Sequence, residues 1–379
     1  MANAMLLSFS NLTAYLNRLL AWLDFLVHYT SGYILYYFFG GIKPQYHTRP
    51  NKKQGAARYA PSVVITGASE GIGLHTAIKL ASHGYTVYAT VKASSEIPKV
   101  ANAMNEAISK HAGRPFPGSV NPRVMDVLKP ESIRSCVDQI ASELRNNPTQ
   151  PLVGLVNNAG YCMISPMEWT SEKDTREIFE LDFWAYISVT KAFLPLIKQN
   201  KGRVINVASA GAYVNPPCWA PYSAVKAAIE GLSRAWRLEL LPFGVGMCTI
   251  KPGFVRTQGI GPKIKSAWKG YHDGVEKSTG AIGVTSLGDV VMADQGAAIG
   301  PMERKVYLPM MEKWHKQIAL DAEGAANPAD EVGQTIYDAL SDVFLQPNYT
   351  VGYDALLGQM VRDLLPENIY EYSIYKTLG

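Results

Sequence analysis

The sequence predicts an α/β protein whose parallel sheet is doubly wound, with helices on both faces. Four short apolar runs, at residues 62–65, 85–90, 123–127 and 152–156, have the length and composition of buried strands. They alternate with helical patterns of ordinary length, which is typical of a parallel sheet. A glycine-rich turn at 66–73 follows the first run directly and leads into a helical pattern.

The composition is that of a globular protein with a sizeable core. The chain has 379 residues, 47% of them hydrophobic, which is enough for one large domain or two small ones. A net charge of +4 gives no indication of a nucleic-acid partner. The widely spaced cysteines form no CxxC pair and have no histidine at metal-ligand spacing: Cys136, Cys162, Cys218 and Cys248. We therefore expect neither a disulfide framework nor a metal site, and the pattern fits a reducing compartment.

The first 60 residues differ from the rest and are predicted to form an apolar helical segment and a linker. Leucines and a tyrosine repeat at helical spacing over 12–26, and an aromatic run follows at 33–39. Asp24 and His28 interrupt any clean span, which leaves a membrane anchor, a dimerisation helix or a helix packed on the protein itself. The aromatic residues and the basic residues after them favour a membrane surface, with the domain at 61–379 on the cytosolic side of the endoplasmic reticulum. A homodimer is a further possibility.

The glycine-rich turn has the features of a nucleotide-binding loop. Gly67, Gly71 and Gly73 stand between a strand and a helix, so backbone N–H groups can approach a pyrophosphate at the helix N-terminus. A glycine cluster can also be only a tight turn, but the strand before it and the helix after it favour the binding role.

The end of the second strand bears on the choice of nicotinamide dinucleotide. An acidic residue there binds the ribose 2′-hydroxyl, whereas a basic residue accepts a 2′-phosphate. Lys92 occupies this end and favours NADP(H) over NAD(H), although Glu70 in the glycine loop would repel a phosphate.

Tyr222 and Lys226 stand four residues apart, so they lie on one face of a helix. A nearby ammonium lowers the pKa of a tyrosine, which suits Tyr222 for acid/base work on a hydroxyl or carbonyl. Ser209 leaves the apolar run 203–207 and can bond the same oxygen. Taken alone the Tyr/Lys spacing is weak, because many surface helices carry it.

The motifs together are similar to those of the classical short-chain dehydrogenases/reductases. They occur in the family's order: the turn 66–73, Asp126, the run 157–160, Ser209, Tyr222-x-x-x-Lys226, and Pro252-Gly253. The resemblance is dense over 61–257, and the runs 347–355 and 364–366 are similar to the tail of the retinol and 17β-hydroxysteroid dehydrogenase branch. It implies a Rossmann-type sheet of about seven strands and NAD(P)-dependent hydride transfer.

The resemblance also implies roles for individual residues. Tyr222 is the expected general acid/base, Lys226 its tuner and a ligand of the nicotinamide ribose, and Ser209 the group that orients the substrate oxygen. Tyr222 and Lys226 are also expected to contact the cofactor, as are the following residues: Gly67, Ser69, Glu70, Gly71, Ile72, Gly73, Lys92, Asp126, Val127, Asn158, Ala159, Gly160, Pro252, Gly253, Val255 and Thr257.

Asp182 is the one expected catalytic residue that departs from the family. Relatives have an asparagine at this place, which supports a water in a proton relay to the lysine. A carboxylate has nearly the same shape but carries charge, and near Lys226 it would stabilise the ammonium. The alternative is that Asp182 faces a helix end or a surface cation.

The substrate side is expected to be apolar, with a lid over about 258–325. Six residues near the motifs predict an aromatic-lined pocket, although any of them could be ordinary core: Tyr161, Cys162, Tyr213, Cys218, Trp219 and Phe254. We therefore expect a small hydrophobic substrate, a steroid-, retinoid-, lipid- or polyketide/terpenoid-like carbonyl or secondary alcohol. The alternative is a non-redox enzyme or a nucleotide-binding scaffold on the same fold.

Overall fold

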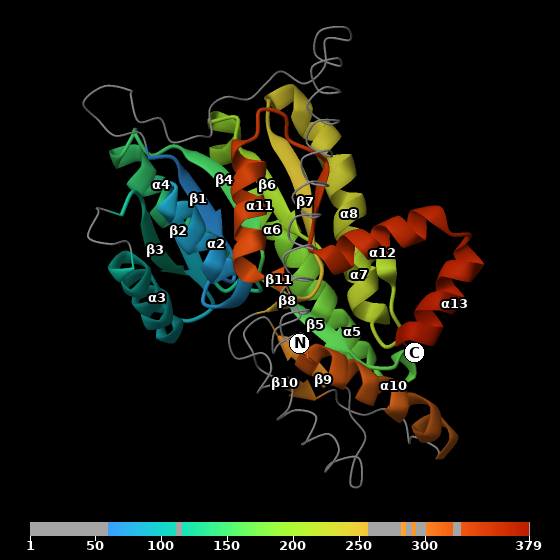
Figure 1. Ribbon diagram of the computed structural model, residues 1–379. Coiled ribbons are helices and arrows are strands. Elements are labelled where there is room, and N and C mark those ends of the chain that lie inside the picture. The colour runs from blue at the N-terminus through green and yellow to red at the C-terminus, as the bar shows by residue number, and fades with distance from the viewer. Residues whose placement is uncertain are drawn as a thin grey trace, which may run out of the picture.

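The computed structural model describes residues 60–110, 116–256, 282–285, 290–292, 301–320 and 327–378. Its centre is a seven-stranded sheet in which every neighbouring pair is parallel, in the order β12-β7-β6-β4-β1-β2-β3 (Figure 1). The strands are β1 (Ser62–Ile65), β2 (Thr86–Val91), β3 (Ser119–Val124), β4 (Leu152–Asn157), β6 (Arg203–Val207), β7 (Gly246–Pro252) and β12 (Asn348–Val351). The predicted Rossmann-type α/β fold is confirmed.

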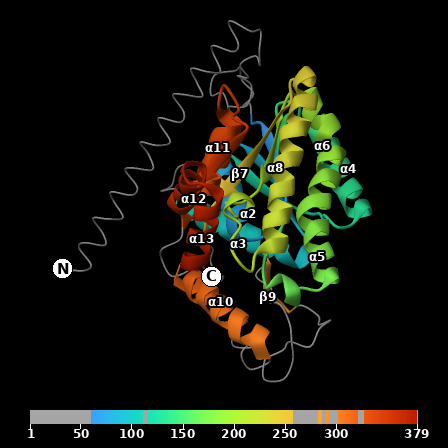
Figure 2. The same ribbon diagram turned by 90° about the vertical axis from the view of Figure 1, so that its right-hand side faces the viewer.

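Alternating side chains on each strand bury two separate cores. In β1, Val63 and Ile65 pack into one core, whereas Val64 packs into the other. The first core lies under α2 (Gly71–Ser82), α3 (Ile97–Ser109) and α11 (Ala329–Ser341). The second lies under α4 (Pro130–Asn146) and α6 (Ala185–Gln199), with α8 (Ala220–Leu240) along the same face (Figure 2). Helices thus cover both faces of the sheet.

The third strand is the one whose predicted position is wrong. The apolar pattern indicated 123–127, but β3 begins at Ser119 and ends at Val124. β3 is the edge strand, paired only with β2 in the sheet, and it contains Pro122. An edge strand tolerates a proline and polar residues, so its pattern is weaker than that of a buried strand.

Smaller elements gather near the carboxyl ends of the strands. β5 (Tyr161–Ile164) pairs with β9 (Ile282–Thr285), which pairs with β10 (Val290–Met292), and β8 (Val255–Arg256) pairs with β11 (Asn327–Pro328). The short helix α7 (Gly211–Val214) precedes α8, and α5 (Glu172–Phe179) precedes α6. Of the predicted lid, the structure describes β9, β10 and the helix α10 (Pro301–Leu320). α10 lies at one end of the molecule, near α13 (Glu367–Leu378) and beyond α12 (Tyr353–Leu364) (Figure 2).

Two buried arginines fasten the C-terminal part of the chain to the sheet. Arg203 in β6 donates to the carbonyl oxygens of Ala339 and Asp342, and Arg237 in α8 donates to that of Leu345 at 2.6 Å. These carbonyls lie in the last turn of α11 and in the segment that joins it to β12, so the contacts fix the approach of the last strand.

The predicted apolar N-terminal segment lies outside the described residues, as do its linker up to 59 and Thr257. Within the described ranges, no helix has both the length and the apolar character needed to cross a membrane.

Candidate active site

The candidate site lies at the carboxyl ends of β4 and β6, under the first turns of α8. Ser209 follows β6 by two residues, and α8 carries Tyr222 and Lys226. Asp182 comes from a π-helical turn, Glu180–Trp184, between α5 and α6. Such turns are rare and often occur at functional sites, because they displace a side chain that a regular helix would place elsewhere.

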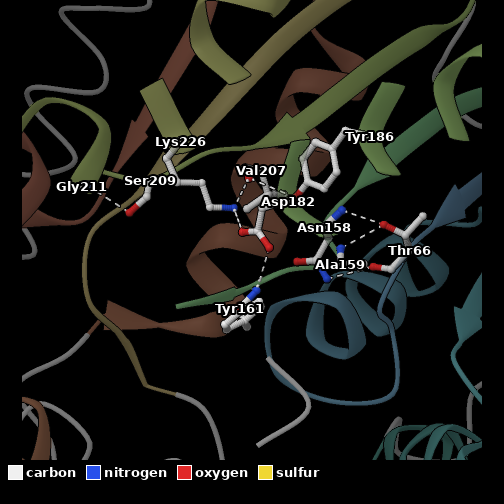
Figure 3. Close-up of polar contacts among 10 residues, drawn as sticks. All are labelled: Thr66, Asn158, Ala159, Tyr161, Asp182, Tyr186, Val207, Ser209, Gly211 and Lys226. Atoms are coloured by element: carbon white, nitrogen blue, oxygen red, sulfur yellow. Dashed lines mark hydrogen bonds and ion pairs between the residues drawn. The ribbon is translucent and has the colours of Figure 1, made fainter. Parts of the chain in front are cut away.

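Lys226 and Asp182 form a buried ion pair at the centre of this site (Figure 3). Lys226 Nζ lies 2.9 Å from Asp182 Oδ2 and donates to the carbonyl oxygen of Val207 at 3.2 Å. Asp182 Oδ1 accepts from the Tyr161 backbone N–H at 3.0 Å. Asp182 is fully buried and Lys226 is only 4% exposed. Burial raises the pKa of Asp182, while the ammonium and the Tyr161 N–H act in the opposite direction. The alternative placement of Asp182, at a helix end or a surface cation, is wrong.

Asp182 leaves no room for a side chain at position 160, which is a glycine. A Cβ atom at position 160 would lie 2.7 Å from Asp182 Oδ2 and 2.9 Å from its Cγ. These distances are shorter than a van der Waals contact, so the carboxylate packs directly on the glycine backbone. The sequence suggested a cofactor contact for Gly160, and the structure adds this second requirement.

Tyr222 and Ser209 lie side by side above this pair. Both side chains pack against Gly211, and Ser209 Oγ accepts from the Gly211 N–H at 3.1 Å. Tyr222 is half-buried, and burial raises its pKa, with Cys162 and Asp182 adding to that effect and the Ser209 hydroxyl opposing it.

The net shift of Tyr222 is opposite to the one expected from the Tyr/Lys spacing. Burial is the main cause of this shift, and Asp182, which lies 2.9 Å from Lys226 Nζ, adds to it, although Lys226 Nζ lies only 5.6 Å from the centroid of the Tyr222 ring. The spacing correctly placed both side chains at one site, but it could not reveal the third charge.

Hydrogen bonds from Asn158 fix the conformation of the glycine-rich turn. Asn158 Nδ2 donates to the carbonyl oxygens of Thr66 at 2.9 Å and Gly67 at 3.1 Å, and Thr66 Oγ1 accepts from the backbone N–H groups of Asn158 and Ala159 (Figure 3). The amide hydrogens of Asn158, which the resemblance implied as a cofactor contact, are thus used to fix the turn. A Cβ on Gly73 would lie 2.7 Å from Asn158 Nδ2, which explains why this position is glycine.

The turn has the features that a dinucleotide requires. Gly67 and Gly71 have φ of +63° and +56°, which glycine adopts without strain, and α2 begins at Gly71. Within the described part of the chain, the buried hydroxyl of Ser69 has no hydrogen-bond partner. A free hydroxyl beside a helix N-terminus fits a phosphate oxygen. Ser69, Ile72 and the backbone of this turn would hold the pyrophosphate.

Charged side chains surround the end of β2 and the glycine-rich turn, and the sequence did not reveal all of them. Lys92 is exposed, and the Glu96 carboxylate accepts from the backbone N–H groups of Lys92 at 2.8 Å and Ala93 at 3.2 Å. The sequence has no acidic residue directly at the end of β2, but the Glu96 side chain reaches it from three residues beyond Ala93. Glu70 pairs with Lys99 of α3 at 3.9 Å.

Asp126 and its neighbour Val127 are partly engaged within the protein. Asp126 Oδ1 accepts from the Leu128 N–H at 3.1 Å, and Oδ2 lies 3.6 Å from Lys129 Nζ. Val127 packs into the core under α4 and α6. The predicted cofactor contacts of these two residues stay predictions.

An aromatic cluster covers Tyr222. The Trp219 ring lies 5.5 Å from the Tyr222 ring, 5.9 Å from the Phe254 ring and 5.2 Å from the Trp314 ring, measured between centroids. Trp314 comes from α10 and was missed by the sequence analysis, because nothing in its local pattern connects it to residues almost a hundred positions earlier. We call the following set the aromatic cluster: Cys162, Ile164, Trp169, Cys218, Trp219, Tyr222, Phe254, Leu308, Met310, Met311 and Trp314.

Two predicted substrate residues do not belong to the aromatic cluster. Tyr213 packs with Ala210 and Ala355, and its hydroxyl donates to the Ala355 carbonyl oxygen at 2.8 Å. It is therefore ordinary core that joins α7 to α12, and its assignment to the pocket is wrong. Tyr161 belongs to a neighbouring cluster with Met163 and Ile178, and Tyr222 packs against that cluster as well.

The loop after β7 is fixed by Asp354 at the start of α12. Asp354 Oδ2 accepts from the Phe254 N–H at 2.6 Å, and Oδ1 accepts from Asn327 Nδ2 at 2.7 Å. A Cβ on Gly253 would collide with the same carboxylate. The C-terminal segment thereby positions Phe254, while Pro252, Gly253 and Val255 remain predicted cofactor contacts.

A family model described as short chain dehydrogenase matches residues 61–266, more than half of the chain. The chain belongs to this family. Among curated relatives, bovine mitochondrial D-beta-hydroxybutyrate dehydrogenase is 33% identical over 192 residues, covering 51% of this chain and 53% of its own. Mouse estradiol 17-beta-dehydrogenase 2 is 34% identical over 201 residues, covering 53% of this chain and 49% of its own. The chain thus spans about half the length of these relatives.

A solved structure supports the same fold. The short chain dehydrogenase from Burkholderia cenocepacia in complex with NADP aligns with a TM-score of 0.55 and 19% identity, covering 83% of this chain and 97% of that one. Among the described residues of the present chain, no group of His, Cys, Asp and Glu side chains could hold a metal ion.

Proposed function

We propose that this protein is an oxidoreductase that transfers a hydride between NADP(H) and a hydrophobic carbonyl or secondary alcohol. The observation that carries the proposal is the arrangement of Ser209, Tyr222 and Lys226 under an apolar aromatic cluster, beside a turn fitted for a pyrophosphate. The named relatives act on hydroxy or keto compounds, as their names say, which supports this class of reaction.

In the direction of reduction, the side chains would have the following catalytic roles. When bound, the nicotinamide supplies the hydride that forms the new C–H bond. Tyr222 donates its phenolic proton to the carbonyl oxygen, so that the product is a neutral alcohol, and Ser209 donates a hydrogen bond to the same oxygen. In oxidation the proton returns to Tyr222.

Lys226 would position the cofactor and supply positive charge. It has three N–H donors, and the ion pair with Asp182 and the bond to Val207 use two of them. The third would donate to a ribose hydroxyl of the nicotinamide half. Its charge favours the phenolate that forms when Tyr222 gives up its proton.

The preference for NADP(H) rests on Lys92. Its side chain is exposed at the end of β2, where a 2′-phosphate would lie, and Lys99 is a second cation nearby in α3. Glu96 and Glu70 oppose the preference, but Glu96 is engaged by two backbone N–H groups and Glu70 pairs with Lys99. The two cations are therefore the groups that can turn towards a phosphate.

The site also supports an apolar substrate and a membrane location. The aromatic cluster over Tyr222 contains tryptophan, phenylalanine and methionine side chains. The sequence of residues 1–42 is apolar and aromatic, and basic residues follow it. Attachment at the endoplasmic reticulum, with the domain in the cytosol, would place the enzyme next to a lipophilic substrate.

The test is the change in nicotinamide absorbance with a panel of lipophilic ketones and alcohols. Tyr222→Phe should retain cofactor binding but lose turnover by about 10²–10⁴-fold, the usual contribution of general acid/base catalysis. Tyr372→Phe, at an exposed position on α13, is the matched control. Near-normal turnover in Tyr222→Phe would remove Tyr222 from the mechanism. Cofactor binding without turnover of any compound in the panel would favour a scaffold or a non-redox enzyme.

A further inference from the structure

Three indole N–H groups in the aromatic cluster are buried without an acceptor among the residues that the structure describes: those of Trp169, Trp219 and Trp314. The side chains of Trp219 and Trp314 are only 8% and 2% exposed. Buried donors are almost always paired. A donor that loses its hydrogen bond to water on burial and finds no acceptor in the protein costs free energy of folding. Three such donors in one cluster therefore call for an acceptor beyond the described residues, and a bound molecule can supply it.

The position of these indoles connects them with the reaction. Trp169 follows β5, Trp219 immediately precedes α8, and Trp314 lies in the middle of α10. All three pack in the cluster that covers Tyr222, and the Trp219 ring lies edge-on to the Tyr222 ring at 5.5 Å. A molecule whose carbonyl oxygen reaches the Tyr222 hydroxyl would therefore lie beside this cluster.

The chemistry of the cluster limits what the partner can be. An indole N–H only donates, so the partner must offer an acceptor. The described members of the cluster include no lysine, arginine, histidine, aspartate or glutamate. Burial raises the pKa of the Cys218 thiol to about 12, so it stays neutral. A carboxylate would lie among these groups without a counter-charge and would lose its hydration, whereas a neutral oxygen would not carry that penalty.

We propose that the substrate carries a second, neutral oxygen acceptor, such as a keto, ester or ether oxygen, that binds the N–H groups of Trp219 and Trp314. The inference rests on the proposed oxidoreductase function and narrows its substrate to oxygenated lipophiles. Simple hydrocarbon ketones lack the second contact, and keto acids carry the wrong charge.

The experiment compares two bicyclic ketones that differ only in the second acceptor. The probes are trans-1-decalone and trans-decalin-1,5-dione, assayed with the full-length protein and NADPH. The dione should be reduced with a kcat/KM about 10-fold higher than that of racemic decalone, beyond the factor of two that its two enantiotopic carbonyls give. One neutral hydrogen bond accounts for roughly 3- to 10-fold.

Variants assign the effect to the indoles. Trp219→Phe and Trp314→Phe keep an aromatic ring but remove the N–H, and each should lower kcat/KM for the dione by about 3- to 10-fold. Any loss of kcat/KM for the decalone, which has no second acceptor, should be smaller, so the ratio of kcat/KM for the dione to kcat/KM for the decalone should fall in both variants. Trp236→Phe is the control, because Trp236 packs in the core under α4 and α6. The thermal unfolding temperature of each variant checks that it is folded.

The outcomes separate the inference from the proposed function. Equal rates for the two ketones, after the factor of two, would overturn the inference while leaving the oxidoreductase intact. So would a loss in the Trp→Phe variants that is the same for both ketones, since that would be a packing effect. If neither ketone is reduced, nor the corresponding alcohols oxidised, the proposed function fails and the inference fails with it. The comparison in the unmodified protein needs no variant, so a variant that misfolds does not decide the question.

Discussion

Replacing Asp182 by asparagine should move the pH dependence of alcohol oxidation to lower pH. Oxidation needs Tyr222 as phenolate, so kcat/KM rises with pH until Tyr222 has lost its proton. Burial is the main reason that the pKa of Tyr222 is raised, and the negative charge of Asp182 adds to it. An amide carries no charge, so Asp182→Asn lowers the pKa of Tyr222, and the basic limb shifts towards lower pH.

The size of the shift follows from the position of Lys226. Its Nζ lies 5.6 Å from the centroid of the Tyr222 ring. At an effective dielectric constant of about 20, a unit charge at that distance contributes ~3 kcal/mol, or about two pKa units. Asp182 Oδ2 lies 2.9 Å from the same Nζ and cancels part of this effect. If half is cancelled, Asp182→Asn lowers the pKa by about one unit. The titration belongs to the coupled set of Tyr222, Lys226 and Asp182.

The substitution also has a structural cost that must be measured separately. Both carboxylate oxygens of Asp182 face donors, Tyr161 N–H and Lys226 Nζ, so the NH₂ of an asparagine meets one of them. Breaking one side of a buried pair costs about 3–5 kcal/mol, part of which the remaining amide oxygen offsets. The thermal unfolding temperature should therefore fall.

The assay is kcat/KM against pH for a secondary alcohol, in parallel with the unfolding temperature. Asp174→Asn is the control, because Asp174 is a buried carboxylate that caps α5 through Ser171 and does not contact Lys226. A basic limb that stays in place in Asp182→Asn, or moves to higher pH, would refute the electrostatic coupling.

Three further predictions concern single features. Lys92→Ala should weaken NADPH binding far more than NADH binding, by about 10-fold or more for a charge-assisted bond, as titration of both cofactors would show; equal losses would mean that Lys92 points elsewhere. Gly160→Ala should lower both activity and the unfolding temperature, because its methyl group would lie 2.7 Å from Asp182 Oδ2. Gly231→Ala, with open space at its Cβ, should lower neither. Unchanged activity in Gly160→Ala would contradict the close packing. Deleting residues 1–42 should move the protein from the membrane pellet to the supernatant with its activity kept, and a full-length protein that stays in the supernatant without detergent would disprove the anchor.

The sequence alone was sufficient for the fold class and for placing Tyr222 and Lys226 together. Strands β1 and β6 lie where their apolar runs predicted them, because buried parallel strands have no polar face to blur the pattern. The Tyr222/Lys226 spacing placed two side chains on one helical face for the same local reason. The edge strand β3 was misplaced by several residues, since its exposed side relaxes the pattern.

Contacts between distant segments were decided only by the tertiary structure. Asp182 meets Lys226, 44 positions further along the chain, through a π-helical turn that has no sequence signature of its own. Trp314 joins Trp219 over the site because α10 folds back, and Tyr213 leaves the pocket because its hydroxyl finds the Ala355 carbonyl. Local spacing predicts which side chains share a face of one element. The partner that compensates a charge or covers a tyrosine depends on how separate elements pack, and no short stretch of sequence encodes that.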